Sequence, residues 1–334
     1  MPATMARYLL SRLVGYVGVI LFGITFIFFL PRFLPSDPVE AMLGKIMSQG
    51  QYMEEAQVNA LRSSLTDAFG LKGSLPEQYG RFVKRVLLTG DFGPSLAMYP
   101  TPVSQLIRDS LPWTFGLLLS AVLIAWVFGN ALGLIVGTRP HWRVSRVLEG
   151  IAICVYPIPY YVLGLVLSIF FCYIWPIFPL TTSVQGAPWT WDFAASVAYN
   201  SFLPAMSIVL VTFGWWLLSM RALSSGVAEE EFVHYARLKG LSERRLLVTY
   251  ILRNALLPQV TFLALQLGLM FNGSIICEIL FSYPGVGSLI YTAVIQGDYN
   301  LLMGTVATSI IAVATATLLV DLIYPLIDPR IRYQ

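Results

Sequence analysis

The side chains that could carry out chemistry are few and lie far apart along the chain. The two histidines, His141 and His234, do not form the His-Glu-x-x-His spacing that presents two ligands to a catalytic zinc ion. The Gly44-Lys45 pair is followed by Ile46, so it lacks the Ser or Thr of a phosphate-binding loop. We therefore predict that the chain is not an enzyme, does not hydrolyse ATP and binds no metal ion or cofactor itself.

Three carboxylates border long apolar stretches: Glu149, Glu278 and Asp321. An ion-coupled carrier needs ionisable groups near the middle of the membrane, whereas each of these lies near the end of its stretch. An ion-coupled secondary transporter stays open as the alternative function. Uptake that survives ATP depletion but collapses with an uncoupler would favour it.

The composition of the chain indicates a membrane protein. Of its 334 residues, 57% are hydrophobic and 12% are charged, and the mean hydropathy is +0.71. Soluble domains contain about 25% charged residues, so the composition argues against a water-soluble enzyme and against a disordered chain. The net charge of +3 is too small to indicate a nucleic-acid partner.

Uncharged stretches predict the positions of the membrane helices, because an ionised side chain at the bilayer centre is costly. The first stretch is 13–31, between Arg12 and Arg32. At about 1.5 Å per residue, it just crosses a hydrocarbon core of about 30 Å. Five further spans are predicted within the uncharged stretches 110–138, 150–191, 193–220, 254–277 and 299–320.

A seventh uncharged stretch, 279–297, is not predicted to span the membrane. Pro284, Gly285 and Gly287 interrupt it within a few residues, and these residue types break a helix. We expect a bent or re-entrant segment at the membrane surface. The sequence therefore predicts an all-α membrane protein with six transmembrane helices.

The basic residues predict the orientation of these spans. Thirteen of the 21 Lys and Arg residues lie in the two tails and in the loops after the second and fourth spans, whereas the loops around 176–202 and 282–298 contain none. Because short cytoplasmic loops are enriched in Lys and Arg, we predict that both termini are cytoplasmic.

The chain is predicted to have four parts. These are a cytoplasmic tail and membrane anchor at 1–31, a large extracytoplasmic insert at 32–109, a five-helix core at 110–326 and a cytoplasmic tail at 327–334. We predict that the first span is an uncleaved anchor, because no small-x-small cleavage site follows it. Whether translation starts at Met1 or Met5 stays open. Within the insert, short helices are predicted at 53–65 and 76–88.

The most informative segment is the cytoplasmic loop 221–258. Glu229, Glu230 and Glu231 are predicted to occupy the first turn of a helix, where negative charge suits the helix dipole. Gly240 stands where a left-handed C-terminal residue belongs, and Ser242 is placed to begin a second helix. In that second helix, an apolar stripe is predicted at Leu246, Leu247, Tyr250 and Ile251. We predict a helix, a glycine turn and a helix leading into the fifth span at Leu257-Pro258.

This loop resembles the EAA loop of permease subunits of ATP-binding-cassette (ABC) importers, in the form found in the oligopeptide and dipeptide permeases. The matching residues are Glu231, Phe232, Val233, Ala236, Arg237, Lys239, Gly240, Leu241 and Ser242, then Arg253, Asn254, Ala255 and Pro258. His234 departs from the general pattern, which has Glu there. Segments 278–287, 297–299 and 321–332 are also similar to this family, so the resemblance covers nearly the whole chain.

The resemblance implies a type I ABC importer permease fold, in which the first helix is accessory to the five-helix core. It also implies that one short helix of the loop is a coupling helix that docks into a groove of an ATPase. The residues expected to dock are Glu230, Glu231, Tyr235, Ala236, Arg237, Lys239, Gly240 and Leu241.

The partners implied by the resemblance are a second homologous permease subunit, two cytoplasmic ATP-binding subunits that carry ATP and Mg²⁺, an extracytoplasmic substrate-binding protein and membrane lipid. The location implied is the cytoplasmic (inner) membrane of a bacterium or archaeon. The function implied is inward movement of peptides or a related small polar solute such as a short oligosaccharide. Since related permeases move nickel, glutathione or opines, the substrate stays open.

A substrate pathway is predicted at Tyr156, Tyr160, Asn272 and Glu278. Prolines loosen the third span next to the two tyrosines, and Asn272 begins a polar interruption of the fifth span. Ordinary helix packing is the alternative explanation. For Glu278, ordering of the adjacent Pro-Gly-Val-Gly segment is favoured over relaying a proton.

Overall fold

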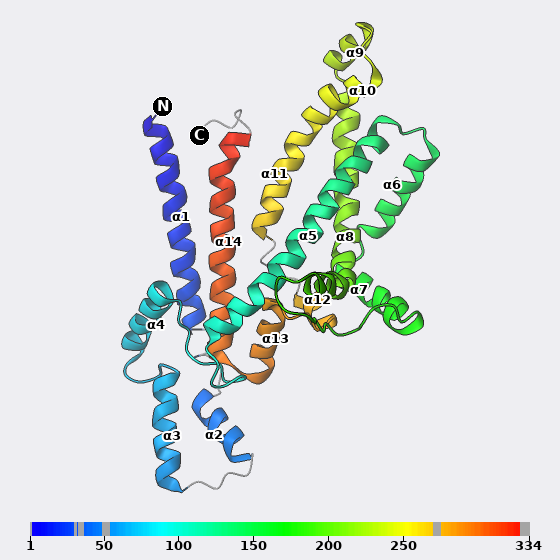
Figure 1. Ribbon diagram of the computed structural model, residues 1–334. Coiled ribbons are helices and arrows are strands. Elements are labelled where there is room, and N and C mark those ends of the chain that lie inside the picture. The colour runs from blue at the N-terminus through cyan, green and yellow to red at the C-terminus, as the bar shows by residue number, and fades with distance from the viewer. Residues whose placement is uncertain (1, 30–31, 33–36, 49–53, 270–274, 328–334) are drawn as a thin grey trace. The chain divides into compact units, whose positions relative to one another are not determined.

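The computed structural model describes the chain except for residues 1, 30–31, 33–36, 49–53, 270–274 and 328–334 (Figure 1). It divides into two compact units. The core unit comprises 1–5, 115–283 and 316–334, and the anchor unit comprises 6–114 and 284–315. Within the described residues, regular structure is helical, and the β pairing is an isolated bridge between Pro94 and Pro102.

The helices follow one another from blue to red in Figure 1. Those up to the fifth are α1 Pro2–Phe29, α2 Pro38–Ser48, α3 Glu55–Ala68, α4 Leu75–Thr89 and α5 Val103–Thr138. Next come α6 Arg143–Val155, α7 Tyr160–Ser168 with the π-helical segment η2 Ile169–Ile174, and α8 Trp191–Ala228. The last are α9 Glu231–Leu238, α10 Glu243–Arg245, the π-helical η3 Leu246–Leu252, α11 Arg253–Leu269, α12 Ile275–Leu280, α13 Val286–Gln296 and α14 Tyr299–Ile327.

Among the described residues, five helices are long and apolar enough to cross a membrane, and a sixth span results if one bent pair is counted. The five are Leu10–Phe29, Val103–Thr138, Trp191–Ala228, Glu243–Leu267 and Tyr299–Leu322. The bent pair is α6 with α7 and η2, which meet at 100°. The structure therefore has five spans, or the predicted six if the bent pair is one span.

The bend in the third span lies where the sequence has Pro157 and Pro159. A proline lacks the amide hydrogen that would continue the helix and its ring clashes with the preceding turn. The residues between α6 and α7 are not helical, and Pro159 takes the cap position of α7. The prolines were expected to loosen this span, and the structure shows that they break it.

No seventh span appears among the described residues. Segment 279–297, which was expected to be bent, contains the short helices α12 and α13 around a non-helical turn at Tyr283-Pro284. Helix α13 has 11 residues, about half of the length needed to cross a bilayer.

The core unit is held together by an unusually close contact between α5 and α8. Gly129, Gly133 and Gly137 are spaced four residues apart and so share one face of α5. A Cβ atom added to Gly133 would lie 2.5 Å from the carbonyl oxygen of Leu217, and one added to Gly137 would lie 2.5 Å from that of Arg221. The backbones of the two helices touch along this face, which is the small-xxx-small packing of membrane helices.

The anchor unit has its own apolar core. Ile24 and Phe28 of α1 are buried together with Phe82 of α4 and Leu301 of α14. The predicted helices at 53–65 and 76–88 appear as α3 and α4. Helix α2 was not predicted; it packs Val39, Met42 and Leu43 against Leu65 of α3.

A buried carboxylate fixes the loop that precedes α5. Asp298 is fully buried and lies just before α14. Its Oδ2 accepts hydrogen bonds from Ser95 Oγ (2.5 Å) and from the backbone amide of Ala97 (2.9 Å), and its Oδ1 accepts one from the amide of Leu301 (3.0 Å). Asp298 thus caps α14 and ties residues 95–97 to it. The predicted division at 109/110 is not tested, although α5 already begins at Val103.

Candidate coupling loop and membrane pathway

The coupling loop begins where α8 ends. Helix α8 continues to Ala228, Glu229 closes it, and Glu230 takes the N-cap position of α9. Only Glu231 therefore lies in the first turn of α9, and the expectation that all three glutamates share that turn was wrong. The reason is that α8 keeps its helical hydrogen bonds almost to the loop, so that Glu229 and Glu230 serve as a two-residue link.

Gly240 makes the turn that was predicted for it. Its φ angle is +75°, in the left-handed region that favours glycine. The amide of Gly240 donates to the carbonyl of Arg237 (3.0 Å), and the amide of Leu241 donates to that of Ala236 (3.4 Å). Ser242 stands at the N-cap of α10, as predicted, although its side chain makes no capping hydrogen bond.

The second helix of the loop leads into the fifth span, as expected, through α10, η3 and α11. These segments form one continuous apolar span, Glu243–Leu267, and Pro258 lies inside α11. Of the predicted stripe, Leu246 and Ile251 are buried and Leu247 and Tyr250 are half-buried against the same core.

Helix α9 has one buried face. Val233 and Ala236 are buried, and Val233 packs with Leu134 of α5, Met220 of α8 and Ile251 of η3. The loop is therefore attached to three membrane helices at once. Figure 1 shows α9 beyond the ends of α8 and α11.

The exposed side of α9 carries three large apolar or aromatic side chains beside Glu231 and His234. Phe232, Tyr235 and Leu238 are 43%, 62% and 71% exposed. Their spacing of three residues places them along one side of the helix. A surface of this kind, at the tip of a helical loop, is typical of a site that a partner protein covers.

The structure places the predicted docking residues unequally. Those that are exposed around α9 are Glu230, Glu231, Tyr235, Arg237, Lys239 and Gly240, while Leu241 is half-buried. Ala236 is only 4% exposed, so it lies on the buried side of α9 and does not face outward. The docking role itself stays a prediction.

Two ion pairs accompany the loop. Arg237 Nε lies 3.3 Å from Glu243 Oε1, across the Gly240 turn, but both side chains are more than half exposed, so this pair contributes little stability. Arg221 of α8 lies 3.0 Å from Glu149 of α6. Glu149 therefore has a basic partner on α8.

The predicted pathway residues fall into separate places. Tyr156 closes α6, and its Cβ lies against Gly214 of α8. Tyr160 begins α7. Glu278 is buried in α12, which packs on α7 where Gly164 faces Leu280.

The structure therefore brings Tyr160 and Glu278 onto two helices in contact, while Tyr156 faces α8. Asn272 lies outside the described residues. The backbone carbonyl of Glu278 accepts a hydrogen bond from the amide of Tyr283 (2.7 Å); this contact does not involve the Glu278 side chain. The pathway and the ordering role expected for Glu278 stay predictions.

Sequence reasoning missed two features that matter to the site. The exposed Leu238 was not among the expected docking residues, although its spacing from Phe232 and Tyr235 was readable. The glycines of α5 were also missed, although their four-residue repeat is visible in the sequence.

Comparison with known proteins identifies the family. Residues 129–333 match the family described as "Binding-protein-dependent transport system inner membrane component". The chain belongs to this family. It is therefore a permease subunit of a binding-protein-dependent importer and a multi-pass protein of the inner membrane, as predicted, and a transport protein instead of an enzyme. Membership also implies ATPase and substrate-binding partners.

Individual relatives extend the match to the rest of the chain. The chain is 28% identical to the oligopeptide transport system permease protein AppB of Bacillus subtilis (strain 168), over 98% of this chain and 100% of AppB. It is 28% identical to the glutathione transport system permease protein GsiC of Pectobacterium atrosepticum, over 99% of this chain and all of GsiC. It is also 28% identical to the dipeptide transport system permease protein DppB of Bacillus subtilis, over 98% of both chains.

Proposed function

We propose that this permease moves peptides, or a related small polar solute such as a short oligosaccharide, into the cell, and that ATP hydrolysis on separate subunits drives the movement. The names of the relatives support a peptide-like substrate, because they describe oligopeptide, dipeptide and glutathione permeases. The family assignment disagrees with the alternative of an ion-coupled secondary transporter.

In the proposed assembly, this chain pairs with a second homologous permease subunit. Two cytoplasmic subunits bind ATP and Mg²⁺, and an extracytoplasmic protein delivers the substrate. Both termini of the chain are cytoplasmic and the insert 32–109 is extracytoplasmic. The distribution of Lys and Arg supports this orientation.

The observation that carries the proposal is the two-sided character of α9. Its apolar outer face, at Phe232, Tyr235 and Leu238, is exposed, while its inner face is packed on three helices of the core unit. An ATPase that covers the outer face would gain the hydrophobic free energy of burying it. A displacement of the ATPase would then be carried directly to α5, α8 and η3.

The proposal is tested by replacing Leu238 with Asp. Burial of a leucine side chain is worth about 1.5–3 kcal/mol, and a carboxylate in its place adds a desolvation cost. We expect co-purification of the ATP-binding subunits to fall by about tenfold or more, since about 1.4 kcal/mol corresponds to tenfold. ATP hydrolysis stimulated by the loaded binding protein should fall in parallel.

The matched control is Val144→Asp. Val144 is 64% exposed, close to the 71% of Leu238, and lies in the first turn of α6 on a loop with the same predicted orientation. This variant should co-purify with the ATP-binding subunits as the unmodified chain does. Equal association of the Leu238 variant and this control would refute the docking role of α9.

A further inference from the structure

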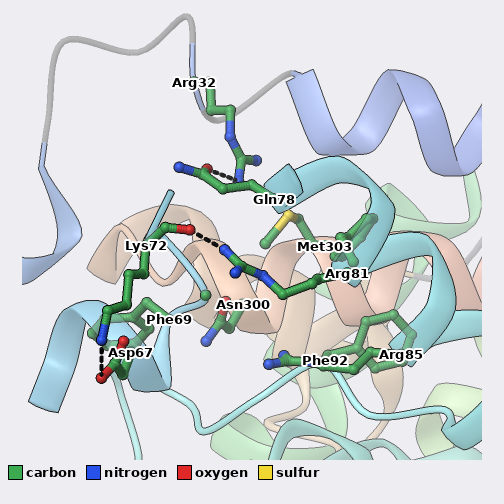
Figure 2. Close-up of a pocket in the computed structure, with 12 residues that line it drawn as sticks. Arg32, Asp67, Phe69, Lys72, Gln78, Arg81, Arg85, Phe92, Asn300 and Met303 are labelled. Carbon is green, nitrogen blue, oxygen red and sulfur yellow. Dashed lines mark hydrogen bonds and ion pairs between the residues drawn. The ribbon is translucent and has the colours of Figure 1, made fainter. Parts of the chain in front are cut away.

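The anchor unit contains a cavity of about 230 Å³ whose wall is strongly basic (Figure 2). Arg32, Lys72, Arg81 and Arg85 line it, whereas Asp67 is the single carboxylate among the lining residues. Aromatic rings and Met303 complete the wall. A cavity with this charge is suited to an anion that also carries apolar groups.

Two of the four basic groups have no acidic partner within the part of the chain that the structure describes. Lys72 Nζ lies 3.3 Å from Asp67 Oδ2, and Arg85 Nε lies 3.6 Å from Asp91 Oδ2. In contrast, Arg32 donates to Gln78 Oε1 (3.1 Å) and to the carbonyl of Phe28 (2.5 Å). Arg81 donates to the carbonyl of Lys72. These neutral acceptors orient the guanidinium groups but leave their charges uncompensated.

Arg32 is the more desolvated of these two groups. Its guanidinium lies over the ring of Phe28, 3.5 Å from the ring centroid, and burial lowers its pKa from the usual value. A guanidinium has five N–H donors in a rigid fork, and phosphate oxygens match that geometry. Burial of the Arg32 charge costs free energy, and no carboxylate of the described residues offsets that cost. An anion bound at this position would offset it.

The cavity adjoins the ends of two apolar helices. Arg32 follows the last residue of the first span, Phe29, by three positions, and Asn300 and Met303 belong to the first turns of α14. Lipid headgroups lie just outside the hydrocarbon core. The end of the first apolar span therefore predicts that the cavity lies at the depth of headgroup phosphates.

Helix α4 packs beside the end of α1. The rings of Phe28 and Tyr79 are 5.2 Å apart, and the hydroxyls of Thr25 and Tyr79 lie 2.7 Å apart. Leu87 and Leu88 of α4 remain 47% and 73% exposed. Leu88 lies one turn from Lys84 and from Arg85, so exposed apolar and basic side chains occur together on the outer side of α4.

We propose that this cavity binds the headgroup phosphate of an anionic phospholipid, such as phosphatidylglycerol. The phosphate lies between Arg32 and Arg81, and the acyl chains extend along exposed apolar side chains of α1, among them Phe26 and Phe29. Under the orientation proposed above, this lipid belongs to the outer leaflet. None of the lining residues belongs to the coupling loop, so the proposal does not rest on ATPase docking.

The experiment uses the full-length chain purified in detergent and measures bound lipid by native mass spectrometry during titration with phosphatidylglycerol. We expect one tightly bound phosphatidylglycerol. In Arg32→Gln/Arg81→Gln, its apparent affinity should be about tenfold or more weaker, because two charge-assisted contacts are lost. Phosphatidylcholine, which carries the same phosphate but no net charge, should bind more weakly than phosphatidylglycerol to the unmodified chain.

The matched control is Arg62→Gln/Lys84→Gln, which removes the same charge from α3 and α4. Arg62 pairs with Glu40, and neither Arg62 nor Lys84 lines the cavity. This control should keep the tightly bound lipid. If the double cavity variant does not fold, Arg81→Gln alone, at an exposed position, provides the same comparison with Lys84→Gln.

Three results would overturn the proposal. One is equal phosphatidylglycerol affinity in the cavity variant and the unmodified chain. Another is an equal loss in the control, which would indicate attraction by net charge. The third is displacement of the lipid by inorganic phosphate at comparable concentration, which would indicate a site for free phosphate.

Discussion

The contact between α5 and α8 leads to a sharp prediction about a single methyl group. In Gly133→Ala, the new Cβ would lie 2.5 Å from the carbonyl oxygen of Leu217 and 2.8 Å from the Cβ of Met220. Real Cβ atoms essentially never approach other heavy atoms closer than 3.0 Å, and a helix carbonyl cannot rotate away without losing its own hydrogen bond. The two helices must therefore separate.

The cost of that separation can be worked from the geometry. Restoring an ordinary contact requires a movement of about 0.5–1 Å, and a gap of that size forfeits a quarter to a half of each dispersion contact along the interface. Overpacking of this kind typically costs about 1–3 kcal/mol. In the same helix, a Cβ on Gly116 would meet nothing within 4 Å. Because both substitutions gain the same helix propensity, the difference between Gly133→Ala and Gly116→Ala isolates the steric cost.

The assay is the unfolding of the two purified variants in mixed micelles titrated with sodium dodecyl sulfate, followed by tryptophan fluorescence. Trp216 is buried in α8 and reports on the interface directly, since a Cβ on Gly129 would touch it. We expect the free energy of unfolding of Gly133→Ala to be lower than that of Gly116→Ala by about 1–3 kcal/mol. Equal stability of the two variants would show that the helices are not in backbone contact in the folded protein.

Two further predictions concern the fixed turns. Asp298→Asn places an amide NH₂ against the amide of Ala97, so a buried charge-assisted hydrogen bond is lost. The free energy of unfolding, measured by thermal unfolding, should fall by about 1.5–3 kcal/mol. The control Asp91→Asn, at a partly exposed ion pair, should lower it by under about 1 kcal/mol. Gly240→Ala places a Cβ at φ +75° and should destabilise the turn by about 1 kcal/mol, measured as faster proteolysis of the loop, while Gly226→Ala within α8 should not.

The positions of the spans were predictable because charge is so costly in a bilayer. The uncharged stretch between Arg12 and Arg32 predicts the first span at 13–31, and the observed apolar span Leu10–Phe29 overlaps it closely, with Arg12 near its N-terminal end. The Gly240 turn was predictable for a similarly local reason, since a left-handed residue needs no partner elsewhere in the chain.

Features that depend on distant partners were not predicted. Pro157 and Pro159 indicated where the third span is interrupted, but the 100° angle depends on how α6 and α7 each pack on α8. The start of α9 was misplaced because Glu229 and Glu230 suit a helix N-terminus and a link between helices equally well. The spacing of Leu238 from Phe232 and Tyr235 is visible in the sequence, but which side of α9 is buried depends on the packing of Val233 and Ala236 against distant helices.

These observations bear on how the proposed ATPase contact would move the pore. The link between α8 and α9 has only two residues, and the buried side of α9 is packed against Met220, which also faces Gly133 of α5. A force on the outer face of α9 therefore reaches α8 and α5 through close contacts, and no flexible linker intervenes on that path. Since α5 and α8 touch along three successive helical turns, they would move together. Movement relative to the third span would then strain the Arg221–Glu149 pair between α8 and α6. Glu149→Gln removes this ion pair and should change the rate of transport more than it changes association with the ATPase. Uptake measurements report on the rate of transport, and co-purification reports on association.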